Sequence, residues 1–254
     1  PIKVAKNTYM FKGDLNYFNT KNGGDISNTA FIITDTEVII IDTGSSHKYG
    51  EAMIKAISKI TNKKITTIIN THHHPDHFLG NSAFKNVNIW ASKITKKSIE
   101  IYGEDYINAL TNLVFDWMKD TKLKAPTSIL KDEYLQVGNY RLKILYLDGH
   151  TKSDIAIYDE NTKVLFASDL IFYNRAAATA SANIKKWLNS LKKLQKIDYS
   201  TIIAGHGIIT KQDKPFIQMI RYLSYLDKTM KDGLAKTKSV FEILQAKQPK
   251  EFNS

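Results

Sequence analysis

Apolar and polar positions divide the chain into short apolar runs and longer segments with helical spacing. The run at 38–41 is apolar and β-branched throughout and does not alternate, as expected of a strand that is covered on both faces. Similar short runs, bounded by turn-forming residues, predict further strands. The predicted strands span 2–12 (as one or two strands), 28–34, 38–42, 65–70, 87–90, 134–137, 140–147, 154–158, 164–167 and 201–204.

Helical spacing appears between these runs. An amphipathic helix that packs on a sheet is predicted by the spacing of Ile184, Trp187, Leu188, Leu191 and Leu194. The segment 92–124 is also mostly helical in pattern, and Pro126 ends it. Further helices are expected from His47 onward, at 216–226 and at 240–244. The turn-rich segment 14–26 is either a flap over a site or a plain connector.

The most distinctive stretch of the chain is Thr71-His72-His73-His74-Pro75-Asp76-His77, which directly follows a predicted strand. Pro75 cannot continue a strand and restricts His74 before it, so we expect these side chains on a loop at the strand's carboxyl end. Imidazole nitrogens and carboxylate oxygens are the ligands that borderline divalent metals prefer. A cluster of this density therefore predicts a metal site.

The spacing of this stretch resembles the His-x-His-x-Asp-His signature of the metallo-β-lactamase superfamily. The matching residues are His72, His74, Asp76 and His77. In that family the first two histidines bind one metal, and the Asp-His pair binds a second.

Three further motifs of the family occur in the order that the family requires. Gly149-His150-Thr151 resembles its Gly-His-Thr turn, and Ala204-Gly205-His206-Gly207 resembles its Pro-Gly-His-Gly. Ser168-Asp169 follows a predicted strand where the family usually has Gly-Asp. The departures at Ser168 and Ala204 affect loop geometry and leave every ligand position filled.

The resemblance implies an α+β fold, a four-layer αββα sandwich with the metal site at one edge of two sheets. Residues 1–254 are expected to form a single domain, with a helical insertion at about 92–126 and C-terminal helices at about 212–246. The implied ligands of the first metal are His72, His74 and His150, those of the second are Asp76, His77 and His206, and Asp169 bridges them. Because all these ligands are nitrogen or oxygen, we expect two Zn²⁺ ions, with iron or manganese allowed.

Other residues are assigned supporting or substrate-binding roles. Asp42, in a turn that resembles the family's Asp-Thr-Gly, is expected to orient a ligand histidine, or else to stabilise the turn itself. Thr151 is expected to support His150 from the same turn. In the family, insertions such as 92–126 cover the pocket. The expected substrate contacts are Tyr102, Tyr106, Phe115, Trp117 and Arg175, although the apolar stripe along this insertion also suits a hydrophobic core.

The chemistry implied by this ligand set is hydrolysis. Water between two divalent metals ionises near neutral pH, which gives a metal-bound hydroxide that attacks an electrophilic carbonyl or phosphorus. Asp76 and Asp169 are the expected catalytic carboxylates, and Asp76 would take a proton from the attacking water. The resemblance therefore implies a metal-dependent hydrolase that cleaves an ester, thioester, lactone or lactam bond of a small, anionic molecule.

Three alternatives stay open: a mononuclear-iron oxygenase similar to the persulfide dioxygenases, a true β-lactamase of the cysteine-free type, and a scaffold protein without catalysis. Residues 165–194 look like the periplasmic metallohydrolases of sulfur-oxidation and quinoprotein relay systems. Asp169 stands where many true lactamases lack a carboxylate, which argues against efficient β-lactam turnover.

Composition narrows the class of protein further. The net charge of +11 comes from lysines spread over helical segments, which favours a solvated surface over a nucleic-acid interface. The chain has no cysteine, which excludes disulfides and thiolate ligands and fits a periplasmic or secreted protein, with a cytoplasmic location as the alternative. No apolar run is long enough for a transmembrane helix. The oligomeric state is left open.

Overall fold

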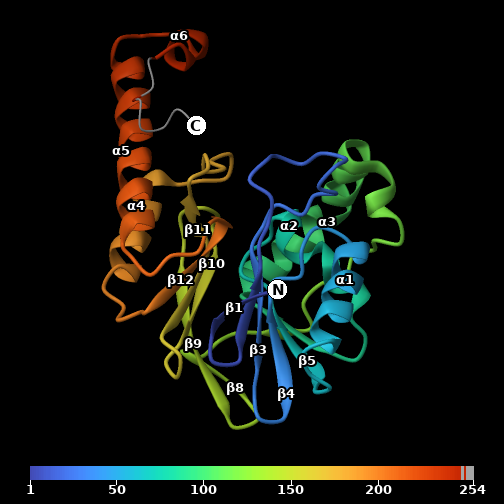
Figure 1. The fold of residues 1–254 in the computed structure, drawn as a ribbon. Coiled ribbons are helices and arrows are strands. Elements are labelled where there is room, and N and C mark those ends of the chain that lie inside the picture. Colours follow the sequence, from blue (N-terminus) through green and yellow to red (C-terminus); the bar gives the residue numbers. More distant parts are fainter. Residues whose placement is uncertain (247–248, 250–254) are drawn as a thin grey trace.

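The computed structural model describes residues 1–246 and residue 249. Two β-sheets face each other, and helices cover the outer face of each sheet (Figure 1). This arrangement confirms the predicted four-layer αββα sandwich. The last part of the predicted domain, 247–248 and 250–254, lies outside the described residues.

The first sheet has seven strands in the order β1-β2-β3-β4-β5-β6-β7. Neighbours from β1 to β4 are antiparallel, and those from β4 to β7 are parallel. Its strands are β1 (Ile2–Ala5), β2 (Thr8–Phe11), β3 (Thr29–Ile33), β4 (Glu37–Ile41), β5 (Lys64–Ile69), β6 (Asn88–Ala91) and β7 (Ser128–Ile129). The short strand β7 was not predicted from the sequence.

The second sheet has five strands in the order β12-β11-β10-β9-β8. Its members pair antiparallel except for β11 and β12, which are parallel. The strands are β8 (Tyr134–Val137), β9 (Tyr140–Leu147), β10 (Asp154–Asp159), β11 (Val164–Tyr173) and β12 (Thr201–Gly207). Consecutive strands from β8 to β11 are therefore neighbours in this sheet.

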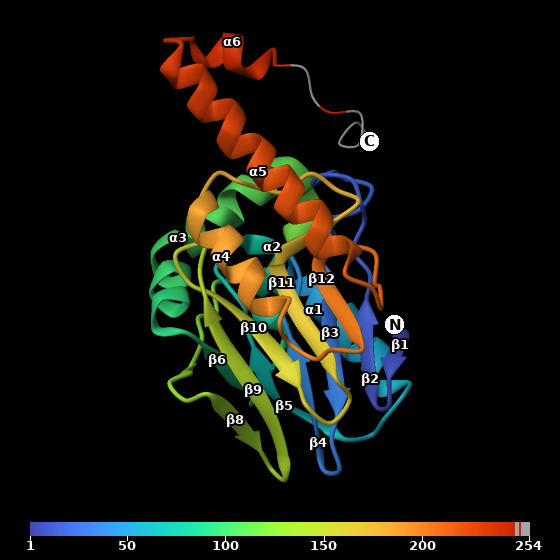
Figure 2. The same cartoon turned by 90° about the vertical axis from the view of Figure 1, so that its left-hand side faces the viewer.

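The helices form the two outer layers and the cover of one edge. Helix α1 packs on the seven-stranded sheet, and α4 and α5 pack on the five-stranded sheet (Figure 2). The bounds are α1 (His47–Ser58), α2 (Pro75–Phe78), α3 (Lys93–Val114), α4 (Ile184–Leu194), α5 (Lys214–Ala235) and α6 (Val240–Leu244). Two 3-10 helices, η1 (Leu79–Ala83) and η2 (Phe115–Met118), follow α2 and α3.

The main core lies between the two sheets. It joins Ile39 and Ile41 of β4 and Ile69 of β5 with Phe166 of β11 and Ile203 of β12, all buried. Since strands β4, β5, β11 and β12 pack so closely, the loops and strand ends that carry the histidines and Asp169 meet at one edge of both sheets. The spacing predicted for α4 is confirmed, because Trp187, Leu191 and Leu194 pack on the outer face of the second sheet.

Strand β11 is longer than the sequence indicated. The prediction ended it before Ser168, whereas the strand continues to Tyr173. The pairing of β11 with β12 is irregular around Ser168, whose φ of 48° lies in the left-handed region. This irregularity turns Asp169 toward the edge while the strand continues, so Asp169 lies within β11 and not after the strand as predicted. His206 likewise lies within β12, which the prediction ended at residue 204.

The predicted apolar stripe of the insertion is only partly core. Ile99 and Leu110 of α3 are buried against Phe78 and Leu79, but Tyr102 and Leu113 are 46% and 43% exposed. A helix that packs on one side buries only a part of its apolar positions. The exposed tyrosine is therefore available at the surface of the molecule.

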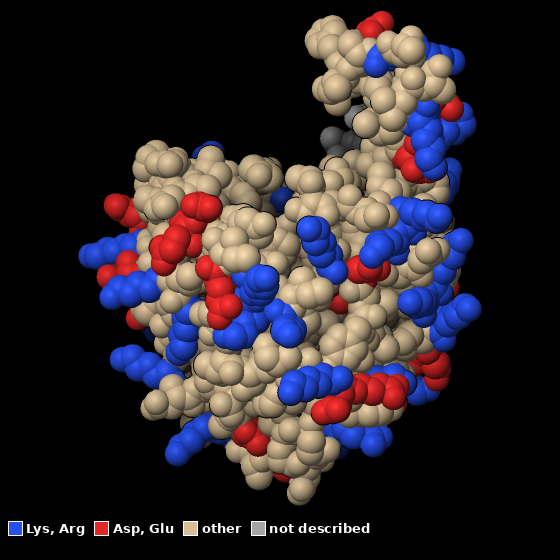
Figure 3. Space-filling model, turned by 180° about the vertical axis from the view of Figure 1, so that it is seen from behind, with Lys and Arg blue, Asp and Glu red and all other residues tan. Residues whose placement is uncertain are grey.

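The distal part of α5, with α6, extends beyond the two sheets (Figures 1 and 2). None of the helices in the described part of the chain is long and apolar enough to cross a membrane. Lysine and arginine side chains are interspersed with acidic ones on the face shown in Figure 3 and form no continuous basic stripe there.

Candidate metal centre

Four separate segments of the chain meet at the edge of the sheets: residues 72–77, the loop with His150, strand β11 with Asp169 and strand β12 with His206. His72 and His74 lie on the loop after β5, and Asp76 and His77 lie in the short helix α2, which Pro75 begins. His150 comes from the loop between β9 and β10. Parallel strands β4, β5 and β6 end at this edge, where a short loop can bring several side chains to one point.

These side chains form two groups that could each hold a metal ion. One group contains His72, His74, His150 and Asp169, and the other contains Asp76, His77 and His206. Within each group the potential ligand atoms all lie within 4.8 Å of one another. The structure thus brings together all seven residues that the sequence predicted as ligands.

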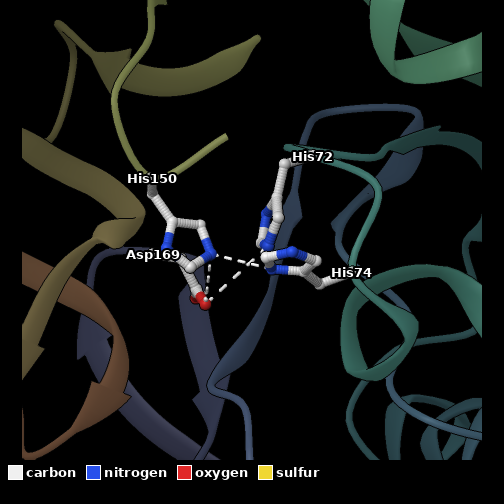
Figure 4. Close-up of side chains that lie close together, drawn as sticks. All are labelled: His72, His74, His150 and Asp169. Atoms are coloured by element: carbon white, nitrogen blue, oxygen red, sulfur yellow. Dashed lines mark hydrogen bonds and ion pairs between the residues drawn. The ribbon is translucent and has the colours of Figure 1, made fainter. Parts of the chain in front are cut away.

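The first group converges from both sheets (Figure 4). His150 Nε2 lies 2.8 Å from His74 Nδ1 and 3.3 Å from Asp169 Oδ2. His72 Nε2 lies 3.7 Å from the same carboxylate oxygen. Three ring nitrogens and one carboxylate oxygen therefore face a common point.

The second group lies on the other side of Asp169. His77 Nε2 lies 3.0 Å from Asp169 Oδ1 and 3.5 Å from Asp76 Oδ2. His206 Nε2 lies 3.2 Å from Asp169 Oδ2 and 3.3 Å from Asp76 Oδ2. Asp169 thus contacts histidines of both groups, which is the geometry expected of a shared ligand.

Several atoms of these groups are buried without a hydrogen-bond partner among the described residues. They are His72 Nε2, His77 Nε2, His150 Nδ1 and Asp169 Oδ1. A buried polar atom without a hydrogen-bond partner costs free energy of folding. A bound cation is one of the few partners that could satisfy His72 Nε2, His77 Nε2 and Asp169 Oδ1. The orphaned Nε2 and Oδ1 atoms therefore fit a metal centre.

The electrostatics of the cluster agree with this interpretation. Burial and the neighbouring histidines hold the pKa of His72 and of His74 well below the usual range. Burial works against ionisation of Asp169, but His206, His77 and His72 hold its pKa well below the usual range. His72 and His74 are thus neutral beside an ionised carboxylate, which is the protonation state that metal binding requires. Burial lowers the pKa of His77, but Asp169, Asp76 and Asp42 together raise it well above the usual range, so metal binding there would release a proton.

Asp42 and Thr71 fix two of the rings. His77 Nδ1 lies 2.7 Å from Asp42 Oδ2 and donates a hydrogen bond to the carboxylate, which leaves Nε2 as the ring nitrogen that faces the second group. Thr71 Oγ1 also donates to Asp42 Oδ2 at 2.7 Å, and it therefore accepts from His72 Nδ1 at 3.1 Å. Burial raises the pKa of Asp42, against the effect of His77. The geometry is what the sequence expected of Asp42, whereas Thr71 was not singled out.

Main-chain contacts hold the second group from the opposite side. Ile26 O accepts from His206 Nδ1 at 2.8 Å, and Ser27 Oγ donates to Asp76 O at 2.5 Å. Asn28 Nδ2 donates to Ala204 O at 2.9 Å. The segment after the turn-rich loop therefore braces both α2 and the end of β12, which no pattern in the sequence indicated.

Asp154 was also missed as a supporting residue. Its carboxylate accepts hydrogen bonds from His150 N at 3.0 Å, from Thr151 N and from Thr151 Oγ1 at 2.6 Å. Burial raises its pKa. Thr151 thus supports the His150 turn, as expected, but it does so through Asp154. A Thr followed three residues later by Asp is a common local hydrogen-bonding pattern and was the available signal.

Aromatic rings form the wall behind two of the histidines. The rings of Phe172 and His206 are stacked, with centroids 4.7 Å apart and an interplanar angle of 11°. The indole of Trp187 meets His150 nearly edge-on at 5.0 Å. Gly205 permits the close approach of β12, since a Cβ there would lie 2.0 Å from Asp169 Oδ1.

The predicted substrate residues lie in different places. Tyr102 and Tyr106 of α3 flank His73, with ring centroids at 6.1 and 6.3 Å, and His73 is itself beside His74. Phe115 is 63% exposed. The indole of Trp117 donates to Thr20 O at 2.9 Å and packs on the turn-rich loop.

Arg175 lies between that loop and His206. Its Nη1 is 3.3 Å from both Asp14 O and Ile26 O and 3.0 Å from His206 Nδ1. A cavity of about 1060 Å³ lies along the loop, but none of the seven candidate ligands lines it.

Known proteins resemble this chain in sequence. Residues 22–206 match the family model described as the metallo-β-lactamase superfamily. The hydroxyacylglutathione hydrolase of Dictyostelium discoideum is 27% identical over 197 residues, which cover 72% of this chain and 63% of that protein. The hydroxyacylglutathione hydrolase of Pelagibacter ubique is 30% identical over 150 residues, which cover 59% of this chain and 54% of that protein. The chain thus spans between half and two thirds of the lengths of these two relatives.

A third relative and two solved structures carry a different name. The metallo-β-lactamase type 2 of Bacillus sp. (strain 170) is 23% identical over 212 residues, covering 81% of this chain and 75% of that protein. The metallo-β-lactamase from Pontibacter korlensis aligns with a TM-score of 0.69 at 19% identity over 88% of this chain and 97% of that one. FIM-1 from Pseudomonas aeruginosa aligns with a TM-score of 0.71 at 17% identity, over 88% of this chain and 94% of that one. The fold, the order of the seven candidate ligands and the matched family model together show that the chain belongs to the metallo-β-lactamase superfamily.

Proposed function

We propose that the chain is a hydrolase with two divalent metals, zinc in the first place, that cleaves a thioester or ester bond in a small anionic molecule. The observation that carries the proposal is the pair of adjacent ligand groups with Asp169 between them. Six further nitrogen and oxygen ligands suit zinc, with iron or manganese allowed.

The residues divide between the two metals as follows. His72, His74 and His150 would hold the first, Asp76, His77 and His206 the second, and Asp169 would contact both. When bound, two such cations activate a water molecule and polarise the bond under attack. The ring hydrogen bonds of His72, His77 and His206 leave each Nε2 free for this purpose.

Asp76 is the proposed proton acceptor. Its main-chain oxygen is held by Ser27, and its Oδ2 faces both His77 and His206 at the centre of the second group. A carboxylate in this position can take a proton from an attacking water and return it to the leaving group. Asp169 has the different role of holding the two groups at a fixed separation.

The proposed substrate class rests on the relatives and on α3. Relatives named hydroxyacylglutathione hydrolase suggest a thioester. Tyr102 and Tyr106 offer hydroxyl donors and ring faces beside His73, next to the first group. We propose that these two tyrosines bind the substrate near the scissile bond, and that Phe115 and Trp117 contact a more distant part of the substrate.

The deciding experiment is a substrate panel on zinc-loaded protein, with activated thioesters, esters, lactones and a cephalosporin. We expect turnover of a thioester or ester, two metals per chain by elemental analysis, and loss of both turnover and one metal in His74→Ala. His47→Ala is the matched control, because His47 begins α1 and bonds to Ser82 away from the two groups. One iron per chain with oxygen consumption, or no hydrolysis of any panel member, would overturn the proposal.

β-Lactam hydrolysis is the second candidate function. The metallo-β-lactamases from Pontibacter korlensis and Pseudomonas aeruginosa share the fold over most of both chains. The cephalosporin in the panel tests this candidate directly, since turnover of the cephalosporin above that of every thioester and ester would make it the main activity.

We also propose a periplasmic or secreted location, which the lack of cysteine supports. Cell fractionation with antibody detection tests it, and recovery of the protein with cytoplasmic markers would overturn it.

A further inference from the structure

Arg175 joins three parts of the chain that are far apart in sequence. It follows β11 by two residues, is half-buried, and directs Nη1 toward two carbonyl oxygens at 3.3 Å, those of Asp14 and Ile26. The same nitrogen lies 3.0 Å from His206 Nδ1. A guanidinium nitrogen can only donate, so its role depends on which of these atoms accept.

The two carbonyls belong to the neck of the loop at 14–26. Asp14 N donates to Asp25 O at 2.8 Å, and Gly13 N donates to Asn28 Oδ1 at 3.1 Å. A Cβ at Gly13 would lie 2.3 Å from the carbonyl carbon of Ile26, so the two chain segments that form the neck are in direct contact. Arg175 therefore closes the neck by bonding to a carbonyl on each side.

The carbonyl of Ile26 also decides the tautomer of His206. A carbonyl oxygen only accepts, so the 2.8 Å contact requires a proton on His206 Nδ1. A protonated Nδ1 cannot accept from Arg175, so Arg175 Nη1 and His206 Nδ1 both donate to the single oxygen of Ile26. His206 Nε2 is then the nitrogen left to face Asp76 and Asp169.

We infer that Arg175 is a positioning residue that couples the order of the loop to the second metal. It holds the Ile26 carbonyl where that oxygen sets the ring and tautomer of His206. The inference rests on the proposed dinuclear function, and it gives Arg175 a role other than substrate binding. Loss of the guanidinium should loosen the loop and weaken the second metal, while the first group, which Arg175 does not touch, keeps its affinity.

The test compares Arg175→Met and Arg175→Lys with the parent. Lys185→Met is the matched control, because it removes an exposed positive charge in α4, shortly after Arg175. Hydrogen exchange at 14–28 is measured on metal-free protein, and zinc affinity is measured in two steps by competition with a chelator. Thermal unfolding verifies that each variant folds.

In Arg175→Met we expect faster exchange at 14–28 and a second-step affinity about 10–100-fold weaker, with the first step unchanged. Arg175→Lys should show smaller changes in exchange and in second-step affinity than Arg175→Met, since Arg175 contacts the two carbonyls through a single nitrogen. Lys185→Met should behave as the parent. Unchanged exchange, an unchanged second step, or an equal loss in both steps would overturn the inference. If the parent binds only one zinc, the proposed dinuclear function is wrong. The hydrogen-exchange data would still test whether Arg175 orders the loop.

Discussion

The two ligand groups share Asp169 but are held in different ways. In the second group, the carboxylate of Asp42 and the carbonyl of Ile26 fix the rings of His77 and His206, and both contacts join segments far apart in the sequence. In the first group, His72 Nδ1 contacts the hydroxyl of the preceding residue, Thr71, and His150 Nδ1 has no partner among the described residues. His150 depends instead on its turn and on the indole of Trp187.

This difference has a physical consequence for the two metals. A ligand whose far ring nitrogen is hydrogen-bonded is fixed in tautomer and direction, which raises its affinity for metal. A ligand held by packing keeps more freedom to rotate. We therefore expect the second group to be sensitive to distant polar substitutions and the first to substitutions in the turn of His150.

The largest effect should come from the residue that both groups share. In Asp169→Ala the two cations would lose a carboxylate between them, so their repulsion rises and one site empties. We expect metal content to fall toward one per chain and turnover to fall by several orders of magnitude. Asp198→Ala, which removes an exposed carboxylate paired with Lys163, is the control. Two metals and parental turnover in Asp169→Ala would show that this carboxylate is not shared.

Asp42→Asn tests the hydrogen-bonded side of the comparison. Asn tolerates the left-handed backbone at this position, where φ is 58°, so the substitution mainly removes the charge that holds His77 Nδ1 and Thr71. We expect the second metal to bind about 10–100-fold more weakly, with a smaller loss at the first through Thr71 and His72. Competition with a chelator measures both steps. Equal losses at the two steps would remove the distinction between the groups.

Asp154→Asn tests the other side. The variant keeps an acceptor for the turn of His150 but loses the charge that strengthens the bonds from His150 N and Thr151. We expect a cost of about 1 kcal/mol, measured as a severalfold weaker first metal with the second unchanged. A loss confined to the second metal would contradict the assignment of His150 to the first group.

The sequence predicted the ligands well because their types and spacing carry the signal. Imidazoles and carboxylates at fixed separations after apolar strands indicate a metal site before any contact is known, and all seven residues do meet. The sequence could not predict Ile26, whose contribution is a carbonyl oxygen, since every residue has one. It also missed the continuation of β11, because the left-handed Ser168 breaks the strand pattern without ending the strand.

Tertiary contacts explain the remaining differences. The stripe along α3 has helical spacing throughout, but the spacing does not say which side faces the core, and Tyr102 proved to be exposed whereas Ile99 is buried. Thr71 was predicted only as the first residue of the histidine loop, yet its hydroxyl connects Asp42, His72 and Ser168. Such roles depend on residues that are distant in sequence, so no local pattern indicates them.

The last predicted effect concerns stability near the loop that braces the second group. Asp25 lies in that loop and lines the cavity of about 1060 Å³, and its Oδ1 is buried without a hydrogen-bond partner among the described residues. Burial, with a contribution from Asp14, raises the pKa of Asp25 to about 7. The pKa of Asp25 is higher in the folded state than in the unfolded state. Its contribution to the stability of the folded state is therefore fully present below about pH 4 and is lost as the pH rises through about 7.

Asp25→Asn should therefore be more stable than the parent at high pH and equal to it at low pH. Since Asp25 is partly exposed, we expect a gain of only about 1 kcal/mol at pH 8, or about 2–4 °C in Tm, that vanishes near pH 4. The measurement is the difference in Tm between variant and parent across this range, because the titration of the histidines then cancels. Asp35→Asn, in the exposed turn between β3 and β4, is the control. A constant difference from pH 4 to pH 8 would mean that the Asp25 carboxylate is not destabilised by its surroundings, and that the loop braces the second group at no electrostatic cost.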